Sequence, residues 1–351
     1  MPFTAAQITT GATYTLNTYQ RTEPLDQVNN KHVLLDWLLK NKQPVTFGNG
    51  SHRVPLYTAN TTNYQNYFGA DQVTYNERDP ARWAEYNHYN FHDGFWFDED
   101  RLAANGIIIT DDANAVPTMT EKEQLIDLLK ISYRSLKEGV QDQLSFELYR
   151  DGTQSNKACP GAELLVAGNP DTGTVAGINQ ATSTWWRNNA SLAIAADTNL
   201  VAGTQQMEVM WRACMRYGGA LPDKIVCGSG FLDALRRNST TAILRQVNDG
   251  GARKGGASID ASVSDVYWHG IPVEWDPTLD GLDTLLSTTT RAKTCYFLNS
   301  KHIQLAPMKG HWMVNRKPER LPDRYVHYFG LTSKYSLIAN RRNSLAVLQI
   351  A

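Results

Sequence analysis

The strongest structural signal in the sequence is TEKEQLIDLLKISYRSLKEGVQDQLSFELYR, residues 120–150. Its apolar side chains recur at mostly four-residue spacing, which places them along one face of a helix. They are Leu125, Leu129, Leu136, Val140, Leu144 and Leu148. Thr120 and Glu123 have the spacing of a capping box, and Gly152 supplies a stop signal. The pattern predicts a helix over residues 121–150, roughly 45 Å long, which would act as a structural strut.

The chain before this helix has a different character. Residues 1–30 are polar and show no apolar period, so we expect an extended arm. A short amphipathic helix should follow, with Val33, Leu34, Trp37 and Leu38 on one face.

Residues 44–100 are dense in Asn, Tyr, Thr and Gln, with turn signals at Gly48-Asn49-Gly50 and Asp79-Pro80. Trp83–Asp98 alternates like a strand, and Val54–Tyr57 could be its partner. So long a segment with little apolar content cannot build a core, yet it has too many aromatic residues for a disordered linker. It predicts a long two-stranded flap that rests on a surface outside its own domain.

An α/β region follows the strut helix, so the fold class is α+β. We expect helices over 205–217, after Thr204, and over 230–237, capped by Ser229. The expected strands are 225–227, 267–275, 294–298 and 303–305. Residues 335–340 and 345–350 should close the chain as a hairpin around Arg341-Arg342-Asn343.

The composition limits the classes of protein to which the chain could belong. The 351 residues are 42% hydrophobic and 20% charged, as in a folded globular protein. The net charge of -1 argues against a dedicated nucleic-acid-binding domain, which is usually far more basic. The N-terminus lacks the features of a secretory signal, and no apolar run reaches the roughly 20 residues of a membrane span. We expect a soluble protein made in a cytosol.

Candidate metal ligands are weakly supported. Cys159, Cys214, Cys227 and Cys295 are far apart, so we expect reduced, mostly buried thiols instead of a zinc or redox motif. His88 and His92 would share one face of an ideal strand, whereas Asp93 would point to the other. Solvated or hydrogen-bonded strand histidines are therefore the better interpretation.

Candidate catalytic and cofactor motifs also fail. Gly228-Ser229-Gly230 lies between a strand and a helix, but position 233 is Asp where a dinucleotide fingerprint needs Gly, and Ser229 lacks a G-x-S-x-G frame. Residues 250–256 lack the Lys-Ser/Thr pair of a phosphate loop. Asp98, Glu99 and Asp100 are typical of a solvated turn. We predict no catalytic, cofactor-binding or metal site. The nine Trp and sixteen Tyr fit a sugar-binding surface and a protein interface equally well.

The order of arm, flap, long helix, α/β region and closing strands resembles the Hong Kong 97-type (HK97-like) fold of tailed-phage major capsid proteins. Several stretches are also similar to sequences of that family. They are GTVAGINQATSTWWRN (173–188), PDKIVCGSGFLDALRR (222–237), HGIPVEWDP (269–277), CYFLNSKHIQLAP (295–307) and SLIANRRNSLAVLQ (336–349). The N-terminal third resembles the family in the order of its expected elements more than in its amino-acid sequence.

The resemblance implies a division of the chain into five parts. They are an arm with a short helix (1–43), an extended loop (44–105), a peripheral domain with a spine helix (106–154), an axial domain (155–300), and a return to the core sheet with a C-terminal hairpin (301–351). It further implies pentamers and hexamers of this chain in an icosahedral virion shell around packaged double-stranded DNA. Assembly would take place in the host bacterial cytoplasm, without enzymatic activity or contact with a membrane.

Partners follow from the same resemblance. The arm is too short and too poorly helical to act as a scaffold, so a separate scaffolding protein is expected, with a portal and a possible decoration protein. Residues 301–351 contain nine Lys or Arg against Glu319 and Asp323. These charges would either lie near DNA phosphates or pair with acidic groups of neighbouring subunits.

Two alternatives remain. An encapsulin-like compartment shares the fold but houses protein cargo instead of DNA. A carbohydrate- or nucleotide-using α/β enzyme would be a monomer or small oligomer with a convergent polar pocket.

The sequence predicts a shell without covalent cross-links. Some relatives join a flap lysine to a neighbour's asparagine, but here no lysine occurs between Lys42 and Lys122. Assembled particles boiled in denaturant should give a single band at the chain mass of 39.3 kDa. A ladder of cross-linked subunits would refute this.

Overall fold

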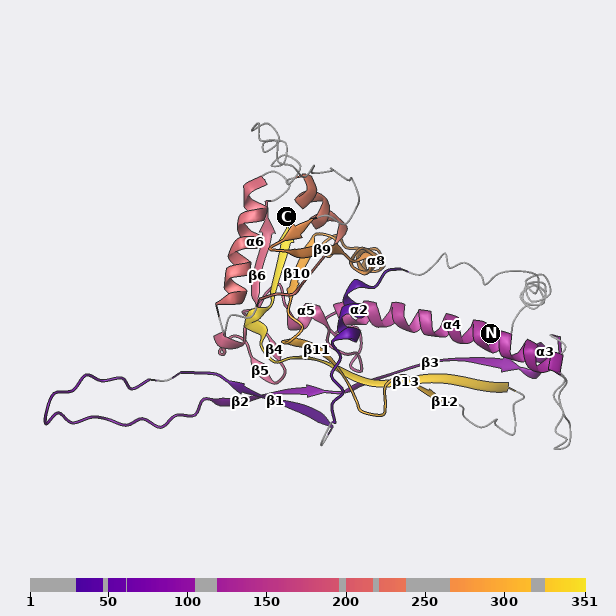
Figure 1. The fold of residues 1–351 in the computed structure, drawn as a ribbon, viewed down its shortest axis with the longest axis horizontal. Coiled ribbons are helices and arrows are strands. Elements are labelled where there is room, and N and C mark those ends of the chain that lie inside the picture. Colours follow the sequence, from indigo (N-terminus) through magenta and orange to yellow (C-terminus); the bar gives the residue numbers. More distant parts are fainter. Residues whose placement is uncertain are drawn as a thin grey trace, which may run out of the picture. The chain divides into compact units, whose positions relative to one another are not determined.

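The computed structural model describes residues 30–46, 50–60, 62–104, 119–195, 200–216, 221–237, 266–316 and 326–351. They belong to two compact units. The first contains Asn90–Leu144 and Gly310–Lys334, and the second contains Lys31–Tyr89, Ser145–Lys309 and Tyr335–Ala351. Figure 1 shows their helices and strands. The expected arm and the loop over residues 250–256 lie outside the described residues.

The first unit is built around α4, which runs from Met119 to Tyr149 and confirms the predicted strut helix. Its other elements are α3 (Glu99–Ala104), β3 (Tyr89–Asp98), β12 (Val314–Arg316) and the first part of β13 (Val326–Ala339). β12 and β3 both pair with β13. The predicted capping box and the side chains of Leu125 and Leu129 lie outside what the structure describes.

The core of the first unit lies between α4 and this sheet. Leu136 and Val140 pack with Leu331 of β13. The ring of Phe95 stacks on that of Phe329 with centroids 5.3 Å apart. Because side chains of a strand alternate between faces, every second residue of β3 turns towards this core. α4 is thus held by strands that come from both sides of it in the sequence.

The second unit contains a six-stranded mixed sheet in the order β6-β14-β10-β7-β9-β8. Its strands are β6 (Asn189–Ile194), β7 (Lys224–Cys227), β8 (Tyr267–Trp268), β9 (Ile271–Trp275), β10 (Thr294–Leu298) and β14 (Ala346–Ile350). Every residue of β10 is buried, because layers cover both of its faces. The predicted strands over 225–227 and 294–298 are therefore confirmed.

One face of this sheet is covered by α6 (Leu200–Met215) and by the helix over residues 229–237, whose apolar side chains form one cluster with the sheet. On β10, Tyr296 contacts Tyr149 at the end of α4, with ring centroids 6.1 Å apart. α8 (Pro277–Leu286) follows β9, and α5 (Ala162–Leu165) precedes the short strands β4 (Thr174–Val175) and β5 (Ile178–Asn179). Among the described residues, no helix has the length and apolar character that crossing a membrane requires.

The second unit also contains α2 (Val33–Lys40), β1 (Ser51–Tyr57), β2 (Ala81–Asn87) and β11 (Ile303–Pro307). α2 confirms the predicted short helix, with Val33, Leu34 and Leu38 buried. Its fourth buried residue is Leu35, whereas the expected Trp37 is only half-buried.

Two segments that the sequence predicts as single strands each form two strands in the structure. Trp83–Asp98 is two strands in different sheets, because β2 pairs with β1 whereas β3 pairs with β13. Residues 267–275 form a hairpin, in which His269 and Gly270 have positive φ as a two-residue turn requires. These predictions of single strands were wrong.

Two further expectations need correction. The helix predicted to start after Thr204 begins at Leu200, because the buried Gly203 continues the helix instead of interrupting it. The closing residues are not a hairpin. β13 pairs with β11, whereas β14 lies between β10 and β6 in another sheet.

Arg342 explains why the chain changes sheets there. Arg342 is 1% exposed, and its guanidinium donates five hydrogen bonds of 2.7–3.2 Å. The acceptors are the carbonyls of Leu164, Leu165 and Trp186 and the side chains of Gln180 and Asn188. Burial lowers the pKa of Arg342 to about 10, so it stays charged at neutral pH. It ties the last turn before β14 to α5 and to the segment that follows α5.

We predict that Arg342→Lys destabilises the fold by about 2–4 kcal/mol, because a lysine cannot reach five acceptors that a planar guanidinium reaches. Arg341→Lys, at the neighbouring and less buried arginine, is the matched control. Thermal unfolding should show a lower midpoint for the Arg342 variant only. Equal midpoints for the two variants would contradict the assignment.

Candidate assembly surface

β1 and β2 form an antiparallel ribbon in which Ser51 pairs with Asn87 and Tyr57 with Ala81. We call residues 51–87, the ribbon and its connecting loop, the flap (Figure 1). The ribbon's side chains alternate in exposure: Ala84 and Tyr86 are buried, whereas Tyr57 and Trp83 are 71% and 60% exposed. The buried side chains therefore belong to one face, and the other face is presented outward.

The base of the flap is anchored in the second unit. The Tyr86 hydroxyl donates to the carbonyl of Ala339 at 2.6 Å, and the Glu85 amide donates to the carbonyl of Ala176 at 3.0 Å. Ser51 donates to Glu85 at 2.5 Å. This hydrogen bond, with the nearby charge of Arg53, lowers the pKa of Glu85. The base is a fixed platform for what extends from it.

The connecting loop, residues 58–80, is exposed throughout its described part except at Thr58, Asn63 and Pro80. Asn63 donates to the Thr74 hydroxyl and the Thr74 amide donates to Gln65, both at 3.2 Å, so hydrogen bonds join the two sides of the loop. Near the tip, the Phe68 amide donates to the Asp71 carboxylate at 2.9 Å. The loop therefore has internal order without burying its own side chains.

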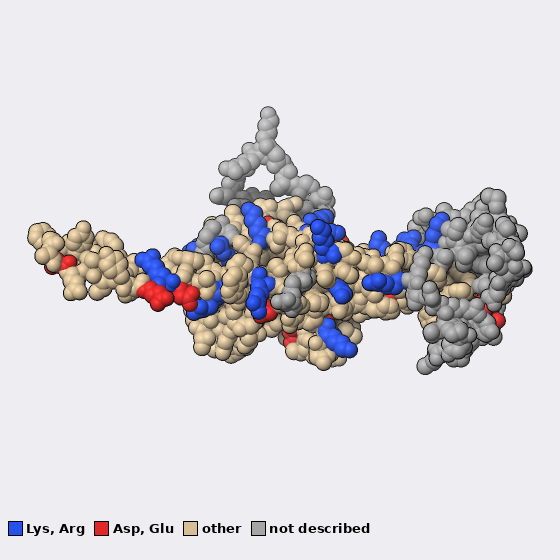
Figure 2. Space-filling view, turned by 90° about the horizontal axis from the view of Figure 1, so that it is seen from below, with Lys and Arg blue, Asp and Glu red and all other residues tan. Residues whose placement is uncertain are grey.

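The loop carries large aromatic side chains in solvent. Tyr64, Tyr67, Phe68 and Tyr75 are 82%, 69%, 89% and 93% exposed. Asp71 is the one charged residue between positions 58 and 76 in the sequence. In Figure 2 the end of the flap is correspondingly almost free of charged groups. A surface with several exposed aromatic side chains and almost no charge is typical of a protein interface.

The glycine motif after β7 has a packing role. A Cβ atom on Gly228 would clash with the backbone of Ala292. The amide of Ser229, where a phosphate would bind, donates instead to Asp280 at 3.2 Å, and the Ser229 hydroxyl donates to the same oxygen at 2.9 Å. The carboxylate occupies the position that an anionic ligand would need.

The candidate metal and acid residues are also dispersed. His88 falls between β2 and β3 and hydrogen-bonds to the carbonyl of Gly50 at 2.8 Å, so the expected common strand with His92 does not exist. Asp98 ends β3, whereas Glu99 and Asp100 form the first turn of α3, where acids complement the helix dipole. Within the described ranges, no group of three or more His, Cys, Asp or Glu could hold a metal ion.

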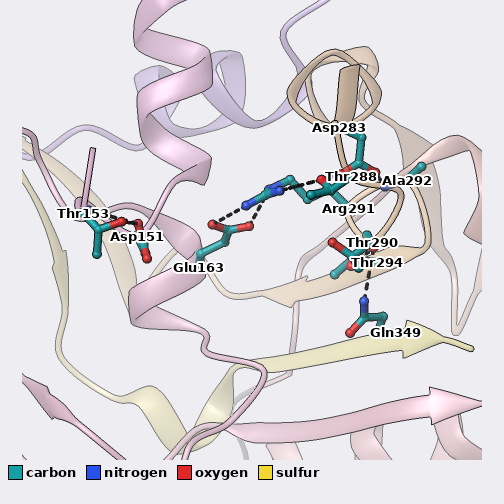
Figure 3. Close-up of polar contacts among 10 residues, drawn as sticks. All are labelled: Asp151, Thr153, Glu163, Asp283, Thr288, Thr290, Arg291, Ala292, Thr294 and Gln349. Atoms are coloured by element: carbon teal, nitrogen blue, oxygen red, sulfur yellow. Dashed lines mark hydrogen bonds and ion pairs between the residues drawn. The ribbon is translucent and has the colours of Figure 1, made fainter. Parts of the chain in front are cut away.

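Figure 3 shows a polar cluster of the second unit. Arg291 contacts both Glu163 oxygens, at 2.6 and 3.1 Å, and lies 3.7 Å from Asp283. Asp283 accepts from the amide of Ala292 at 2.7 Å and from the hydroxyl of Thr288 at 2.6 Å. Burial opposes the charge of Arg291, but Glu163 and Asp283 raise its pKa overall. Both carboxylates are thus occupied in joining α5, α8 and the loop before β10.

A hollow of about 550 Å³ lies in the first unit. Its walls include His92, Trp96, Arg316 and Tyr328. None of the described residues that line it carries a carboxylate.

Comparison with known proteins places the fold. No family model and no curated protein matches the chain. Solved structures of phage capsids do match the chain. The capsid asymmetric unit of cyanophage A-1(L) has a TM-score of 0.60 at 14% identity, covering 94% of this chain and 96% of that chain.

Two further structures agree. Mycobacterium phage Bobi gives a TM-score of 0.54 at 9% identity over 100% of this chain and 99% of that chain. The capsid of Myoviridae phage XM1 gives 0.53 at 10% identity, over 95% and 98%. The chain therefore has the α+β fold of phage capsid proteins, which confirms the fold implied by the sequence resemblance.

The sequence predicted the flap but not the contacts that hold its base. The dense aromatic composition indicated an interface, and the exposed rings of the loop agree with that. The contacts of Tyr86 and Glu85 join segments far apart in the chain, and no local pattern signals them.

We predict that the four cysteines are unreactive in the native protein. All are buried and free, and burial raises the pKa of Cys159, Cys214 and Cys227 to about 12 and holds that of Cys295 well above its usual value. At pH 8 a disulfide reagent should titrate almost no thiol before unfolding and all four after it. Asn156→Cys, at an exposed position, is the positive control. A thiol that reacts quickly in the native protein without this substitution would show that at least one of the four cysteines is accessible, and would contradict the prediction.

Proposed function

We propose that this chain is a major capsid protein, whose copies assemble as pentamers and hexamers into an icosahedral shell around packaged double-stranded phage DNA. The observation that carries the proposal is the anchored flap with its exposed aromatic loop. The likeness to phage capsids over nearly the whole chain supports it.

The flap needs a partner of the right size. An aromatic side chain buries on the order of 150–250 Å². Four of them would approach the roughly 800 Å² that one protein contributes to a standard interface. A neighbouring copy of the same chain is the partner we propose, because closed symmetry then repeats one contact many times.

We assign the five parts of the chain as the sequence implied, with arm (1–43), extended loop (44–105), peripheral domain (106–154), axial domain (155–300) and closing segment (301–351). The strand assignments refine the second part: the ribbon and loop end at Asn87, and β3 belongs to the sheet of β13. The flap as defined here is the portion that would lie across the adjacent subunit.

The remaining partners and the location are part of the same proposal. We propose a virion protein that assembles in the host bacterial cytoplasm with a separate scaffolding protein, a portal and possible decoration protein. Correctly sized shells from the chain expressed alone would argue against a separate scaffold. Of the nine basic residues after position 300, Arg342 is buried, so it does not contribute to DNA contact. We further propose that the chain is not an enzyme, because its candidate catalytic groups serve packing.

The proposal predicts that purified protein forms megadalton particles or capsomers in negative-stain microscopy and sedimentation. Replacing Tyr64, Tyr67, Phe68 and Tyr75 together by Ser should reduce particle yield at least tenfold, while thermal unfolding of the subunit stays unchanged because these rings are exposed.

The matched control replaces the exposed Asn66, Gln72 and Asn76 of the same loop by Ser and should assemble normally. A stable monomer whose flap packs on its own body would overturn the proposal. Particles from infected cells that enclose protein cargo instead of DNA would favour an encapsulin-like compartment.

A further inference from the structure

The short helix α2 lies at a junction. The chain reaches it from residues 1–29 and leaves it towards the flap. Directly after α2, the amides of Gln43 and Val45 donate to the carbonyls of Leu305 and Pro307, both at 3.0 Å. α2 therefore connects the N-terminal segment to the flap, and the chain at its C-terminal end is tied to β11.

The N-terminus of α2 has no cap of its own. The preceding residue, His32, makes no side-chain capping hydrogen bond. The first-turn amide of Leu34 donates instead to Oδ2 of Asp276, at 3.0 Å and 242 residues away in sequence. Since the first amides of a helix lack partners within it, this carboxylate replaces the missing local cap.

The same carboxylate connects two other helices. Oδ2 also accepts the Tyr149 hydroxyl at the end of α4, at 2.8 Å, and Oδ1 accepts the amide of Thr278 at the start of α8, at 2.9 Å. Asp276 is fully buried. Burial, together with the charge of Asp276, raises the pKa of Tyr149 well above its usual value, so the phenol remains a donor.

We propose that Asp276 is a positioning residue for assembly: by capping α2 from a distance, it fixes the helix that connects the N-terminal segment to the flap. The assembly role rests on the proposed function. The capping role is independent of it.

One substitution separates capping of α2 from general core stability. Asn is as good an N-cap as Asp. In Asp276→Asn one acceptor oxygen remains, and in the Oδ1 position it still accepts from Thr278 and keeps α8 capped. The amide nitrogen then faces the Leu34 N–H, which is a donor opposite a donor. Tyr149 can turn its hydroxyl to accept, but the Leu34 amide loses its acceptor.

The experiment measures hydrogen exchange in the full-length protein. In Asp276→Asn the amides of residues 33–40 should exchange about tenfold faster or more, because a hydrogen bond to a charged group is lost. The amides of α8 should keep their wild-type rates. Particle yield should fall with the loss of protection in α2.

Rescue gives the decisive comparison. Adding His32→Ser to Asp276→Asn supplies a local cap that can accept from Leu34 or Leu35, so protection of α2 and particle yield should recover. His32→Ala in the same background supplies no acceptor and should not rescue. Tyr149→Phe leaves the capping oxygen in place, so exchange in α2 should stay near the wild-type rate.

Unchanged exchange over residues 33–40 in both Asp276→Asn and Asp276→Ala, the second of which removes both oxygens, would overturn the proposal. Equal acceleration in α2 and α8, without rescue by His32→Ser, would also overturn it, because Asp276 would then be an ordinary core residue. If Asp276→Asn alone is insoluble, folding restored by His32→Ser but not by His32→Ala supports the cap, and failure of both contradicts it. Wild-type protein that forms no particles would overturn the proposed function and leave the exchange comparison valid.

Discussion

Burial of one stripe along α4 is the constraint on which the described fold depends. A helix of 31 residues with a polar outer face gains little stability from propensity, so tertiary contacts must cover its apolar stripe. In the first unit, Leu136 and Val140 meet side chains of β3 and β13. In the second unit, Leu148 and Tyr149 are buried, and the Tyr149 hydroxyl reaches Asp276. Segments far before and far after α4 therefore have to return to it.

The flap obeys a different constraint. A two-stranded ribbon is only marginally stable by itself, because one of its faces lacks a core to pack on. Here the contacts at Tyr86 and Glu85 fix its base, and the hydrogen bonds across the loop order its end. What they leave in water is the aromatic side chains. Ordering the loop costs conformational entropy, and rings left in water do not offset that cost. The free energy becomes favourable when a second surface buries those rings.

The sequence predicted elements better than partnerships. α4, β7, β10 and β11 follow from local apolar patterns and turn signals, which neighbouring residues encode. A two-residue period reveals which face of a strand is apolar, but not which strand it pairs with. The division of Trp83–Asp98 between two sheets was therefore invisible, and so was the separation of β13 from β14. The long-range polar contacts were equally hidden. Asp276 followed by Pro277 is a recognisable start of α8, but its second role, at Leu34, depends on the fold alone.

The paired polar groups and the exposed aromatic side chains both bear on the choice between an assembly protein and an enzyme. An active site keeps polar groups available for a substrate, which leaves them poorly satisfied by the fold. Here the residues that most resemble such groups are already occupied: Asp280 holds Ser229, and Glu163 holds Arg291. The unsatisfied surface is instead apolar and aromatic, and it lies on the flap. A surface of that kind lowers its free energy when it packs against another protein, which supports the proposed role in assembly.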